Sequence, residues 1–401
     1  MKILHVVPTY YPAVRYGGPI YSVHALCRAL AAAGHQVHVI TTSVDGAGDS
    51  NVPHGRPVDL DGVQVHYFRS WLLRRIYWSA DLADALSSMT ADFDVVHLHS
   101  VFLFPTWAGA RAAVRARVPY VLSPRGMLDR ELIARRSTIT KRAWIRLVER
   151  GNLARSARIH LTSTEERRAL LDLGLALAPL SVIPNGVEAP ASFASDAISP
   201  DVRALVAQGF DILSFGRISW KKGLDRLIRA LAQLPDATAL IAGNDEERFA
   251  ERLRILAKQT GAGDRVRLLP RQVGGADKEA LFTAARLFAL PSVSENFGNV
   301  VAEAMIRGLP VVVSERVGAA EIVRAGGAGA VAGSGQQDFA AALAALLRSE
   351  QRLADAGASG VSYAREHLTW DRVAYSFGEL YRTIAREGNA GPAQRRLDDA
   401  A

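Results

Sequence analysis

Two glutamates at the start of a predicted helix form the first candidate for chemistry. Glu295 lies in a polar loop after an apolar strand, and Glu303 follows eight positions later on the first turns of the helix. Between them, Gly298, Asn299 and Val300 would present backbone N–H groups, which bind phosphate or sugar oxygens at a helix start. Carboxylates accept hydrogen bonds, so the pair suits the hydroxyls of a sugar and a ribose. Glutamates are also common at helix starts because they offset the helix dipole, so the pair alone leaves a structural role open.

A second loop between a predicted strand and helix carries two cations. Arg217 and Lys222 follow the apolar run Ile212–Phe215, and Gly223 permits a close approach of a ligand to the backbone. An arginine and a lysine that converge from one loop can bind two phosphates. We expect the neighbouring Lys221 to be solvated.

A strongly basic stretch lies between Arg130 and Arg158, in a chain whose net charge is +8. It holds nine basic residues against two glutamates, which is nine minus two, or +7. The basic residues are Arg130, Arg135, Arg136, Lys141, Arg142, Arg146, Arg150, Arg155 and Arg158. Apolar residues are interleaved with them, so we predict a basic amphipathic helix that can bind anionic lipid headgroups, phosphorylated substrates or nucleic acid. A solvated helix face is an equal alternative.

These loops need a scaffold of parallel strands, and the sequence predicts two such scaffolds. Apolar strands and helical segments alternate from Ile3 to about Val187, and the alternation restarts at Ile212 after a stretch rich in Ala, Ser, Pro and Asp. Two successive alternating halves predict two doubly wound α/β domains, 1–188 and 200–369, with a closing helix at 370–386 that joins the first domain. Ligands bind at the carboxyl ends of such strands, so we expect an active-site cleft between the domains.

The compartment follows from what the sequence lacks. No run of about 18 apolar residues, the length of a membrane helix, is present. The N-terminal apolar run is short and ends at Pro8, which predicts a first strand rather than a signal peptide. The single cysteine, Cys27, cannot form an intramolecular disulfide. We therefore expect a cytoplasmic protein.

The two loops together resemble those of glycosyltransferase family 4. The combination is Gly216-Arg217 with Lys222-Gly223, followed about eighty residues later by Glu295 and Glu303. The likeness spans most of the chain, because further family segments occur at Gly17-Gly18, Asp94–His99, Ile183–Val187 and Val317–Val323. The resemblance implies the GT-B architecture, in which two Rossmann-like domains face a central cleft. It also implies a retaining hexosyltransferase that uses a nucleotide-diphosphate sugar.

The resemblance implies a role for each residue of these motifs. Arg217 and Lys222 would neutralise the donor diphosphate, Glu303 would hold the ribose hydroxyls, and Glu295 would hold the transferred sugar. The family needs no divalent metal for the diphosphate, which agrees with two cations supplied by the protein, and no cofactor is expected. The remaining donor contacts would be backbone groups, those of Gly17, Gly18, Phe297, Gly298, Asn299 and Val300.

Two further candidates lie in the first half of the chain. His99 shares a strand face with His97 but lies nearer the carboxyl end. In the family the histidine at this position sits by the transferred sugar, so we predict that His99 belongs to the reaction centre and that His97 is structural. His99 is not expected to be a general base, since the front-face mechanism usually described for the family lets the leaving phosphate take the acceptor proton. Arg125 is a candidate contact for the acceptor or the donor phosphates, with a structural role as the alternative.

The segment Ser123–Leu128 also suggests an acceptor. Similar segments occur in bacterial family members linked to surface polysaccharides, so we expect a cell-surface glycan or a lipid-linked precursor. The protein would be peripheral at the inner face of the plasma membrane, with the basic stretch as its lipid contact. Closure of the two domains on the donor is expected to bring the N-terminal loop and His99 to the sugar.

Other functions fit the sequence less well. A nicotinamide-dependent oxidoreductase would need a Gly-x-Gly-x-x-Gly after the first strand and an acidic residue after the second, and both are absent. Asp92 and Asp94 precede a strand rather than follow it, which argues against a metal-dependent transferase. A nucleotide-sugar epimerase of the same architecture remains an alternative, as does a non-catalytic protein that binds membranes or nucleic acid through the basic stretch. No motif for specific recognition of nucleic acid is present.

Overall fold

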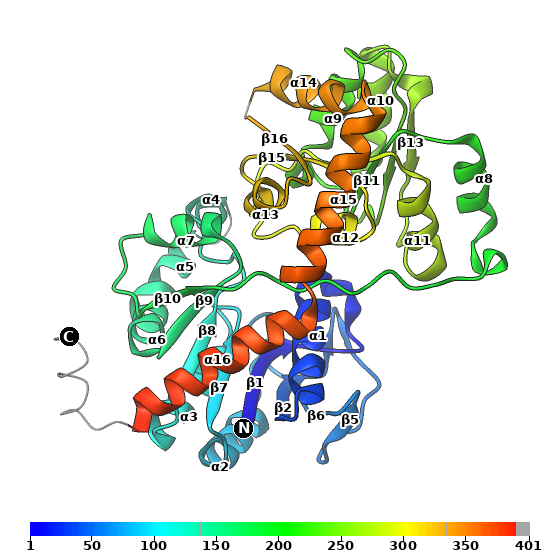
Figure 1. Cartoon of the computed structure of the whole chain (residues 1–401). Coiled ribbons are helices and arrows are strands. Elements are labelled where there is room, and N and C mark those ends of the chain that lie inside the picture. The colour runs from blue at the N-terminus through cyan, green and yellow to red at the C-terminus, as the bar shows by residue number, and fades with distance from the viewer. Residues whose placement is uncertain (136–137, 334, 390–401) are drawn as a thin grey trace. The chain divides into compact units, whose positions relative to one another are not determined.

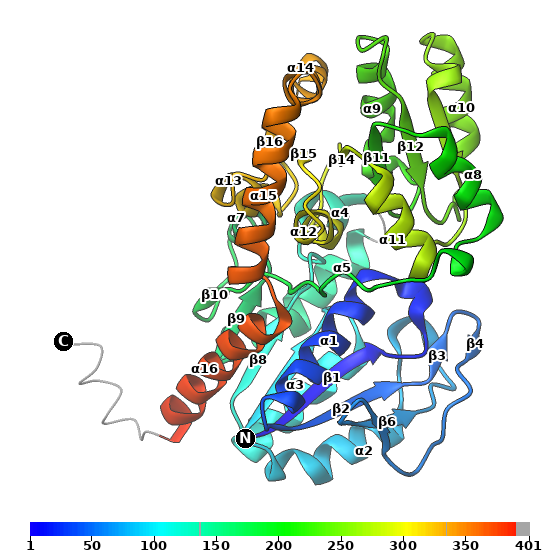
Figure 2. The ribbon, with the colours of Figure 1, turned by 45° about the vertical axis from the view of Figure 1, so that its right-hand side comes forward.

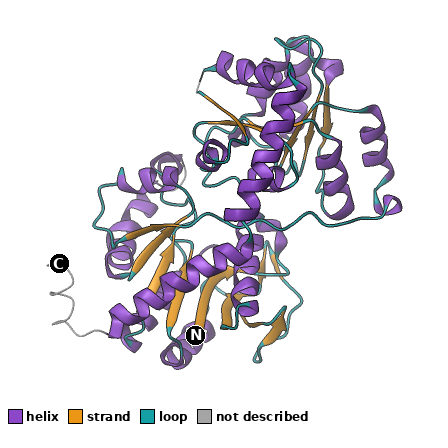
Figure 3. Ribbon diagram, in the orientation of Figure 1, coloured by secondary structure: helices purple, strands orange, loops and turns teal. Residues whose placement is uncertain are grey.

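The computed structural model describes residues 1–135, 138–333 and 335–389. The chain divides into two compact units, one made of Met1–Gly186 with the segment that begins at Trp370, and one made of Val187–Thr369. Each unit contains a largely parallel sheet with helices on both faces (Figures 1 and 3). The predicted α/β class with two Rossmann-like domains is therefore confirmed.

The sheet of the first unit has the strand order β10-β9-β8-β7-β1-β2-β6-β5. Its neighbouring strands are parallel, except that β5 is antiparallel to β6. A small separate hairpin follows β2, and this hairpin and the edge strands β5 and β10 had not been predicted. The strands are β1 (Lys2–Thr9), β2 (Gln36–Thr42), β3 (Val44–Asp45), β4 (Gly48–Asp49), β5 (Val58–Leu60), β6 (Val63–Phe68), β7 (Val95–His99), β8 (Tyr120–Ser123), β9 (Arg158–Leu161) and β10 (Leu180–Val182).

Helices cover both faces of this first sheet. Pro19 occupies the first turn of α1, where its missing N–H costs no hydrogen bond. The closing helix α16 packs an apolar face that includes Phe377 and Tyr381 against α1, in a core shared with β1, β2 and β6. The helices are α1 (Gly18–Ala32), α2 (Ala80–Met89), α3 (Phe104–Ala116), α7 (Thr164–Leu171) and α16 (Trp370–Asn389), together with those of the basic stretch.

The basic stretch is helical, as predicted, over 130–135 and 138–155, but the second of these runs is not a regular α-helix. It forms α4 (Arg130–Arg135), α5 (Thr138–Trp144), a π-helical turn (Ile145–Glu149) and α6 (Arg150–Arg155). Helix α6 stops because Ser156 is extended and leads the chain into β9, which begins at Arg158. Arg136 lies outside the described residues.

The sheet of the second unit has the strand order β13-β12-β11-β14-β15-β16, and all of its pairs are parallel. The strands are β11 (Ile212–Phe215), β12 (Ala239–Ala242), β13 (Val266–Leu269), β14 (Leu287–Leu290), β15 (Val311–Ser314) and β16 (Gly329–Ala332). Only β16 had not been predicted, because its Gly-Ala-Val-Ala sequence consists mostly of small residues and lacks a run of large apolar side chains.

Two separate cores lie on the two faces of this second sheet. The core on one face includes residues of α8, α11, α12 and α15, and the core on the other includes residues of α9, α10 and α14 (Figure 2). The helices are α8 (Pro200–Gln208), α9 (Leu224–Leu231), α10 (Phe249–Gln259), α11 (Gly275–Ala284), α12 (Asn299–Ile306), α13 (Ala320–Ala325), α14 (Gln336–Leu347) and α15 (Glu350–His367). Within the described ranges of the whole chain, no helix combines the length and the apolar character needed to cross a bilayer.

Candidate active site

The carboxyl end of the second sheet brings the two predicted loops together. Strand β11 lies between β12 and β14, so the strand order reverses at the β11–β14 pair. Ligands of doubly wound sheets bind outside the carboxyl ends of the strands at such a reversal. The loop after β11 carries Arg217 and Lys222, and the loop after β14 carries Glu295. Two loops that are far apart in sequence therefore meet where the sheet topology favours a ligand.

Lys222 and Glu295 are in direct contact. The Nζ atom of Lys222 lies 2.8 Å from Oε1 of Glu295, and the two side chains are 16% and 18% exposed. The hydroxyl of Ser292 donates to the same oxygen over 3.3 Å. Burial alone would raise the pKa of Glu295, but the Lys222 ammonium outweighs it and holds the pKa below its usual value. Glu295 is therefore ionised at neutral pH and forms an ion pair with Lys222.

The backbone around this ion pair is tightly packed. The N–H of Val293 donates to the carbonyl of Lys221 over 2.9 Å, which ties the two loops together. Gly223 has a φ of +58°, and a Cβ on it would lie 2.2 Å from the carbonyl oxygen of Pro291. Only glycine tolerates both this backbone angle and this close approach. Gly223 therefore sets the spacing of the loops that carry Lys222 and Glu295.

Helix α12 begins beside the ion pair. Gly298 precedes its first residue and has a φ of +91°, and the N–H of Val301 bonds back to the Gly298 carbonyl over 2.8 Å. The first turn thus directs its N–H groups out of the helix start, toward the side that favours an anion. Phe297 is buried, and its carbonyl accepts a hydrogen bond from Ala319, which anchors the helix start.

Glu303, on α12, also pairs with a cation. Its Oε2 atom lies 2.9 Å from Nζ of Lys278 on α11, and the side chains are 28% and 22% exposed. The sequence did not single out Lys278, because its proximity to Glu303 depends on the packing of two helices that are not adjacent in sequence. Arg217 differs from both lysines: its side chain is exposed and, among the described residues, has no ion-pair partner. One predicted diphosphate ligand is therefore already paired, and the other is open to solvent.

The first sheet has a similar reversal. Strand β1 lies between β2 and β7, and the order reverses at the β1–β7 pair. The loop after β1 leads through Gly17, with a φ of +76°, to Gly18 at the first position of α1. His99 is the last residue of β7. The residues that we predicted in the first half thus flank the topological switch point of their own sheet.

His99 is buried, with an exposed fraction of 1%, and both of its ring nitrogens are engaged. Arg125 donates from Nη2 to Nδ1 of His99 over 3.1 Å, and Nε2 of His99 lies 3.0 Å from Nδ1 of His5. An arginine can only donate, so the proton of His99 is assigned to Nε2, which donates to His5. Burial and the charge of Arg125 lower the pKa of His99 well below its usual value, so the ring is neutral.

A second buried chain of hydrogen bonds passes through His97. His160 donates from Nε2 to the carbonyl of Ile183 over 2.9 Å, so its Nδ1 accepts from the Ser123 hydroxyl over 2.7 Å. Ser123 accepts from Nε2 of His97 over 2.7 Å, and Nδ1 of His97 accepts from the Tyr381 hydroxyl over 2.6 Å. Burial is the main cause that lowers the pKa of His160 to about 3 and that of His97 well below its usual value. This neutral chain joins α16 to β7, β8 and β9.

Three histidines come close enough to suggest a metal site, but their hydrogen bonds do not fit one. Ring nitrogens of His5, His97 and His99 lie within 4.8 Å of one another. Both nitrogens of His97 and of His99 are already hydrogen-bonded, and the charged Arg125 beside His99 opposes a second cation. The sequence did not reveal this cluster, because the pairing of β1 with β7 that brings His5 to His97 is set by the sheet order.

Arg125 links His99 to the segment that leaves the first unit. Its Nη1 donates to Oδ1 of Asn185 over 3.1 Å, and its Nη2 donates to His99. The next residue, Gly126, donates its N–H to the buried carboxylate of Glu166 over 2.6 Å. The guanidinium is thus engaged by protein groups, and a contact with acceptor or phosphate stays a prediction. Asn185 was noticed only as part of a family segment, and its contact with Arg125 appears only in the structure.

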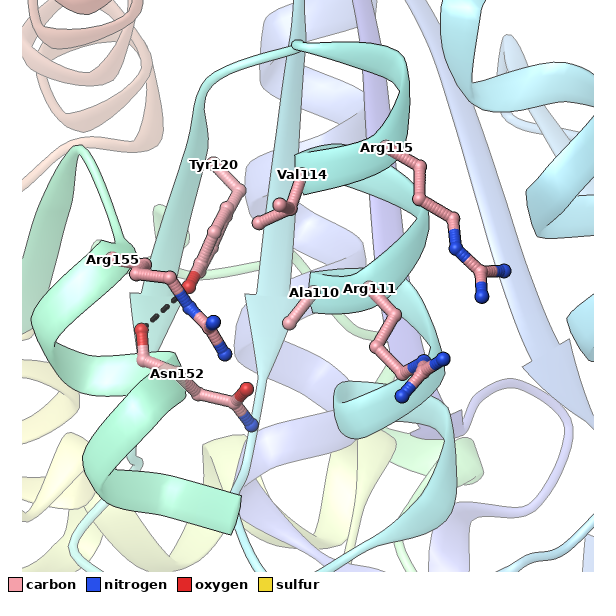
Figure 4. A pocket seen from close by; sticks show the side chains of 7 residues that line it. All are labelled: Ala110, Arg111, Val114, Arg115, Tyr120, Asn152 and Arg155. Atoms are coloured by element: carbon pink, nitrogen blue, oxygen red, sulfur yellow. Dashed lines mark hydrogen bonds between the residues drawn. The ribbon is translucent and has the colours of Figure 1, made fainter.

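A surface pocket lies elsewhere in the first unit (Figure 4). It is lined by residues of α3, α6 and the first residue of β8: Ala110, Arg111, Val114, Arg115, Tyr120, Asn152 and Arg155. The hydroxyl of Tyr120 donates to the Asn152 carbonyl over 2.6 Å, while Arg111 and Arg115 extend away from that pair in Figure 4. Tyr120 begins its strand, so the pocket lies toward the amino end of β8 and has no part in the candidate site.

Comparisons with known proteins agree with this arrangement of two motif-bearing units. Residues 17–186 match the glycosyl transferase 4-like domain, and residues 199–361 match the family described as glycosyl transferases group 1. A D-inositol 3-phosphate glycosyltransferase of Nocardia farcinica is 33% identical over 245 residues, which are 58% of this chain and 54% of that enzyme. The chain thus spans about half the length of the curated relatives of this kind that it matches.

Two further proteins match over nearly their whole length. A glycogen synthase of Mycobacterium tuberculosis is 29% identical, over 98% of this chain and 97% of that enzyme. The crystal structure of HepE from Anabaena in complex with UDP-glucose superposes with a TM-score of 0.71 at 23% identity, over 96% of this chain and 100% of that chain. The two matched domains, in this order and on this fold, show that the chain belongs to glycosyltransferase family 4 and has the GT-B fold.

Proposed function

We propose that this protein transfers a hexose from a nucleotide-diphosphate sugar, with retention of configuration, and that the second unit binds the donor. The observation that carries the proposal is the cluster at the β11–β14 reversal, where Arg217, Lys222 and Glu295 lie beside the start of α12. A diphosphate needs cations and helix-start N–H groups, and a sugar needs carboxylates that accept hydrogen bonds. The complex of HepE with UDP-glucose supports the same class of donor.

The ion pair of Lys222 with Glu295 suggests how the donor is received. A diphosphate carries more negative charge than one carboxylate, so it would draw the Lys222 ammonium toward itself. The Glu295 carboxylate would then be free to accept a hydrogen bond from a hydroxyl of the transferred sugar. Arg217, which is exposed, would supply the second cation, and together the two would stabilise the charge that develops on the leaving diphosphate. Because the protein supplies both cations, we propose that no divalent metal is needed.

Glu303 would bind the ribose without losing its partner. Its carboxylate has a second oxygen beside the one held by Lys278, so it can accept from a ribose hydroxyl while it keeps the ion pair. In the first unit, Gly17 and Gly18 would let the loop before α1 approach the phosphates, and His99 would border the transferred sugar. Closure of the two units on the donor is part of this proposal.

We further propose that the acceptor is a cell-surface glycan or its lipid-linked precursor, reached at the inner face of the plasma membrane. The support is a two-row pattern that runs along α5 and the π-helical turn to the first residue of α6. Arg142, Arg146 and Arg150 repeat every four residues and are all exposed, and the adjacent row carries Ile139 and Leu147, which are 86% and 80% exposed. An apolar row beside a cationic row is typical of a helix that lies at a lipid surface.

A thermal-shift experiment without metal tests the donor proposal. The protein, washed with EDTA, is mixed with UDP-, GDP- and ADP-sugars and with the free nucleotides. At a hundred times its dissociation constant a ligand stabilises the native state by about 2.7 kcal/mol, which is about 5–10 °C for a unit of this size. We expect one nucleotide to give such a shift and the Arg217→Gln/Lys222→Gln variant to lose it. A folded sample that responds to no nucleotide would contradict the proposal.

A further inference from the structure

The first unit presents three consecutive large apolar side chains to solvent. Trp71, Leu72 and Leu73 are 70%, 65% and 66% exposed. The other exposed large hydrophobic residues in the described part of the chain are separated in sequence from one another. Single exposed hydrophobic residues are normal on protein surfaces, whereas a contiguous group rimmed by charge marks an interaction site. We refer to Arg69–Ile76 as the Trp71 loop.

Hydrogen bonds hold the Trp71 loop so that it projects away from the core. Arg74 donates from Nη2 to the carbonyl of Gly48 over 2.5 Å and from Nη1 to the carbonyl of Ser70 over 3.0 Å, and it forms an ion pair with Asp49 over 3.3 Å. A 3-10 turn at Arg74–Ile76 closes the loop, with Leu73 in the left-handed region at a φ of +48°. The base of the loop is therefore fixed to the β3–β4 hairpin, and the apolar tip stays in water instead of folding back.

The charges around the tip of the Trp71 loop indicate which kind of surface it can bind. The guanidinium of Arg69 stacks over the ring of Trp71 at 5.1 Å, and both Arg69 and Arg75 are exposed. The segment from Arg69 to Ile76 contains no acidic residue. Tryptophan and leucine enter the boundary between headgroups and acyl chains, while arginines remain with anionic headgroups. The tip thus combines apolar insertion with positive charge, which complements an anionic lipid surface.

The Trp71 loop leaves the first sheet at the same edge as the segment that leads to the basic helices. Strands β6, β2, β1, β7 and β8 are parallel, so the segments that follow Phe68 and Ser123 both emerge at the carboxyl edge. Four strand spacings separate β6 from β8, or about 19 Å. The loops after β1, β7 and β8, which hold Gly17, His99 and Arg125, emerge between or beside them. The Trp71 loop and the segment that leads to the basic helices therefore start at the same edge of the first sheet.

We infer that the Trp71 loop is a second lipid-contacting element, which inserts Trp71, Leu72 and Leu73 into an anionic bilayer surface while the row of Arg142, Arg146 and Arg150 binds headgroups. This inference rests on the membrane location proposed above. Two weak contacts on one rigid sheet strengthen each other, because the first holds the second at a high local concentration.

Vesicle binding by the full chain tests the inference. The probe is a vesicle of 70% phosphatidylcholine and 30% phosphatidylglycerol, with pure phosphatidylcholine as the neutral comparison. We expect Trp71→Ser/Leu72→Ser/Leu73→Ser to weaken binding to the anionic vesicle by about tenfold or more. Ile255→Ser/Tyr375→Ser, which removes side chains that are 50% and 64% exposed at other places, is the matched control and should bind like the wild type.

Fluorescence reports on insertion directly. The emission of Trp71, taken as the difference between the wild type and Trp71→Phe, should shift to shorter wavelength with anionic vesicles and be quenched by lipids brominated near the headgroup. Unchanged emission, or binding by the triple serine variant that equals the wild type, overturns the inference. In either of those two cases, loss of binding in the variant Arg142→Gln/Arg146→Gln/Arg150→Gln would show that the membrane location stands without the Trp71 loop. If the wild type binds neither vesicle, the membrane location and this inference both fail.

Discussion

Replacement of Lys222 by methionine separates what the ion pair does for stability from what it does for catalysis. Methionine keeps most of the apolar stem but removes the charge, so Glu295 is left without its ammonium partner. An unpaired charge in a fully buried site costs about 3–5 kcal/mol. Glu295 is 18% exposed and keeps the Ser292 hydroxyl at 3.3 Å, so we expect a smaller loss of unfolding free energy, about 2–3 kcal/mol at pH 7.5.

The pH dependence of this loss has a definite sign. In the wild type the pKa of Glu295 is below its usual value, so the stability from its ionised form is present above the unfolded pKa and declines as the pH falls through the folded pKa. In Lys222→Met the raising effect of burial is no longer opposed by that ammonium, and Glu295 takes up a proton more readily. The difference in unfolding free energy between wild type and variant should therefore shrink toward about pH 4.

Denaturant unfolding and steady-state kinetics complete the test. Lys222→Met/Glu295→Gln removes both charges, so its stability should return to within about 1 kcal/mol of the wild type. Its kcat/KM should remain at least about a hundredfold low, as in Lys222→Met, because the leaving diphosphate still lacks its cation. Lys221→Met removes an equal charge one residue earlier and serves as the control. A double variant as unstable as the single one would refute the argument from the ion pair, and near-normal turnover in Lys222→Met would refute the role in diphosphate binding.

Three further variants probe other parts of the structure. Gly223→Ala should lower the unfolding free energy of the second unit by about 2–3 kcal/mol, measured by denaturant, because its Cβ would meet Pro291. Gly209→Ala, with a similar φ of +71° but open space around it, should cost only about 1 kcal/mol, and equal losses would contradict the steric argument. His160, whose pKa is lowered to about 3, destabilises the fold as the pH falls from 6.5, so His160→Gln should reduce the slope of stability against pH by about 1.4 kcal/mol per unit. Arg125→Lys should lower kcat more than it changes KM, and it should alter the nitrogen-15 chemical shifts of the histidine rings. Unchanged ring shifts would show that Arg125 does not set the tautomers of these histidines.

The histidine network shows how tertiary structure changes the meaning of a motif. The segment that ends at His99 resembles a family segment whose histidine lies by the sugar, and the sequence therefore favoured a direct contact. In the structure His99 is buried and donates to His5, while Arg125 fixes its protonation. A direct contact with the sugar would require Nε2 of His99 to exchange His5 for a sugar hydroxyl.

The sequence by itself determined the fold class and the position of the loops that carry the motifs. Short apolar runs such as β12 and β14, separated by amphipathic helices, can bury their surface only in doubly wound sheets, so the two-domain α/β prediction is confirmed. The family was also predicted correctly, since Arg217, Lys222, Glu295 and Glu303 occur in a specific order. The edge strands β5, β10 and β16 were missed because polar or small residues interrupt them, so none forms a continuous run of large apolar side chains.

Tertiary structure alone decided which side chains meet. The ion pairs of Glu295 with Lys222 and of Glu303 with Lys278 depend on the order of the strands and on helix packing, and no local pattern encodes either. The end of the basic helices at Arg155 follows from Ser156, which is extended and leads the chain into β9. The exposure of the Trp71 loop is also a tertiary property, because a run of Trp, Leu and Leu would otherwise predict a buried segment. Sequence patterns report what each residue prefers locally, whereas contacts between distant segments are set by the sheet order and by the cores that form around it.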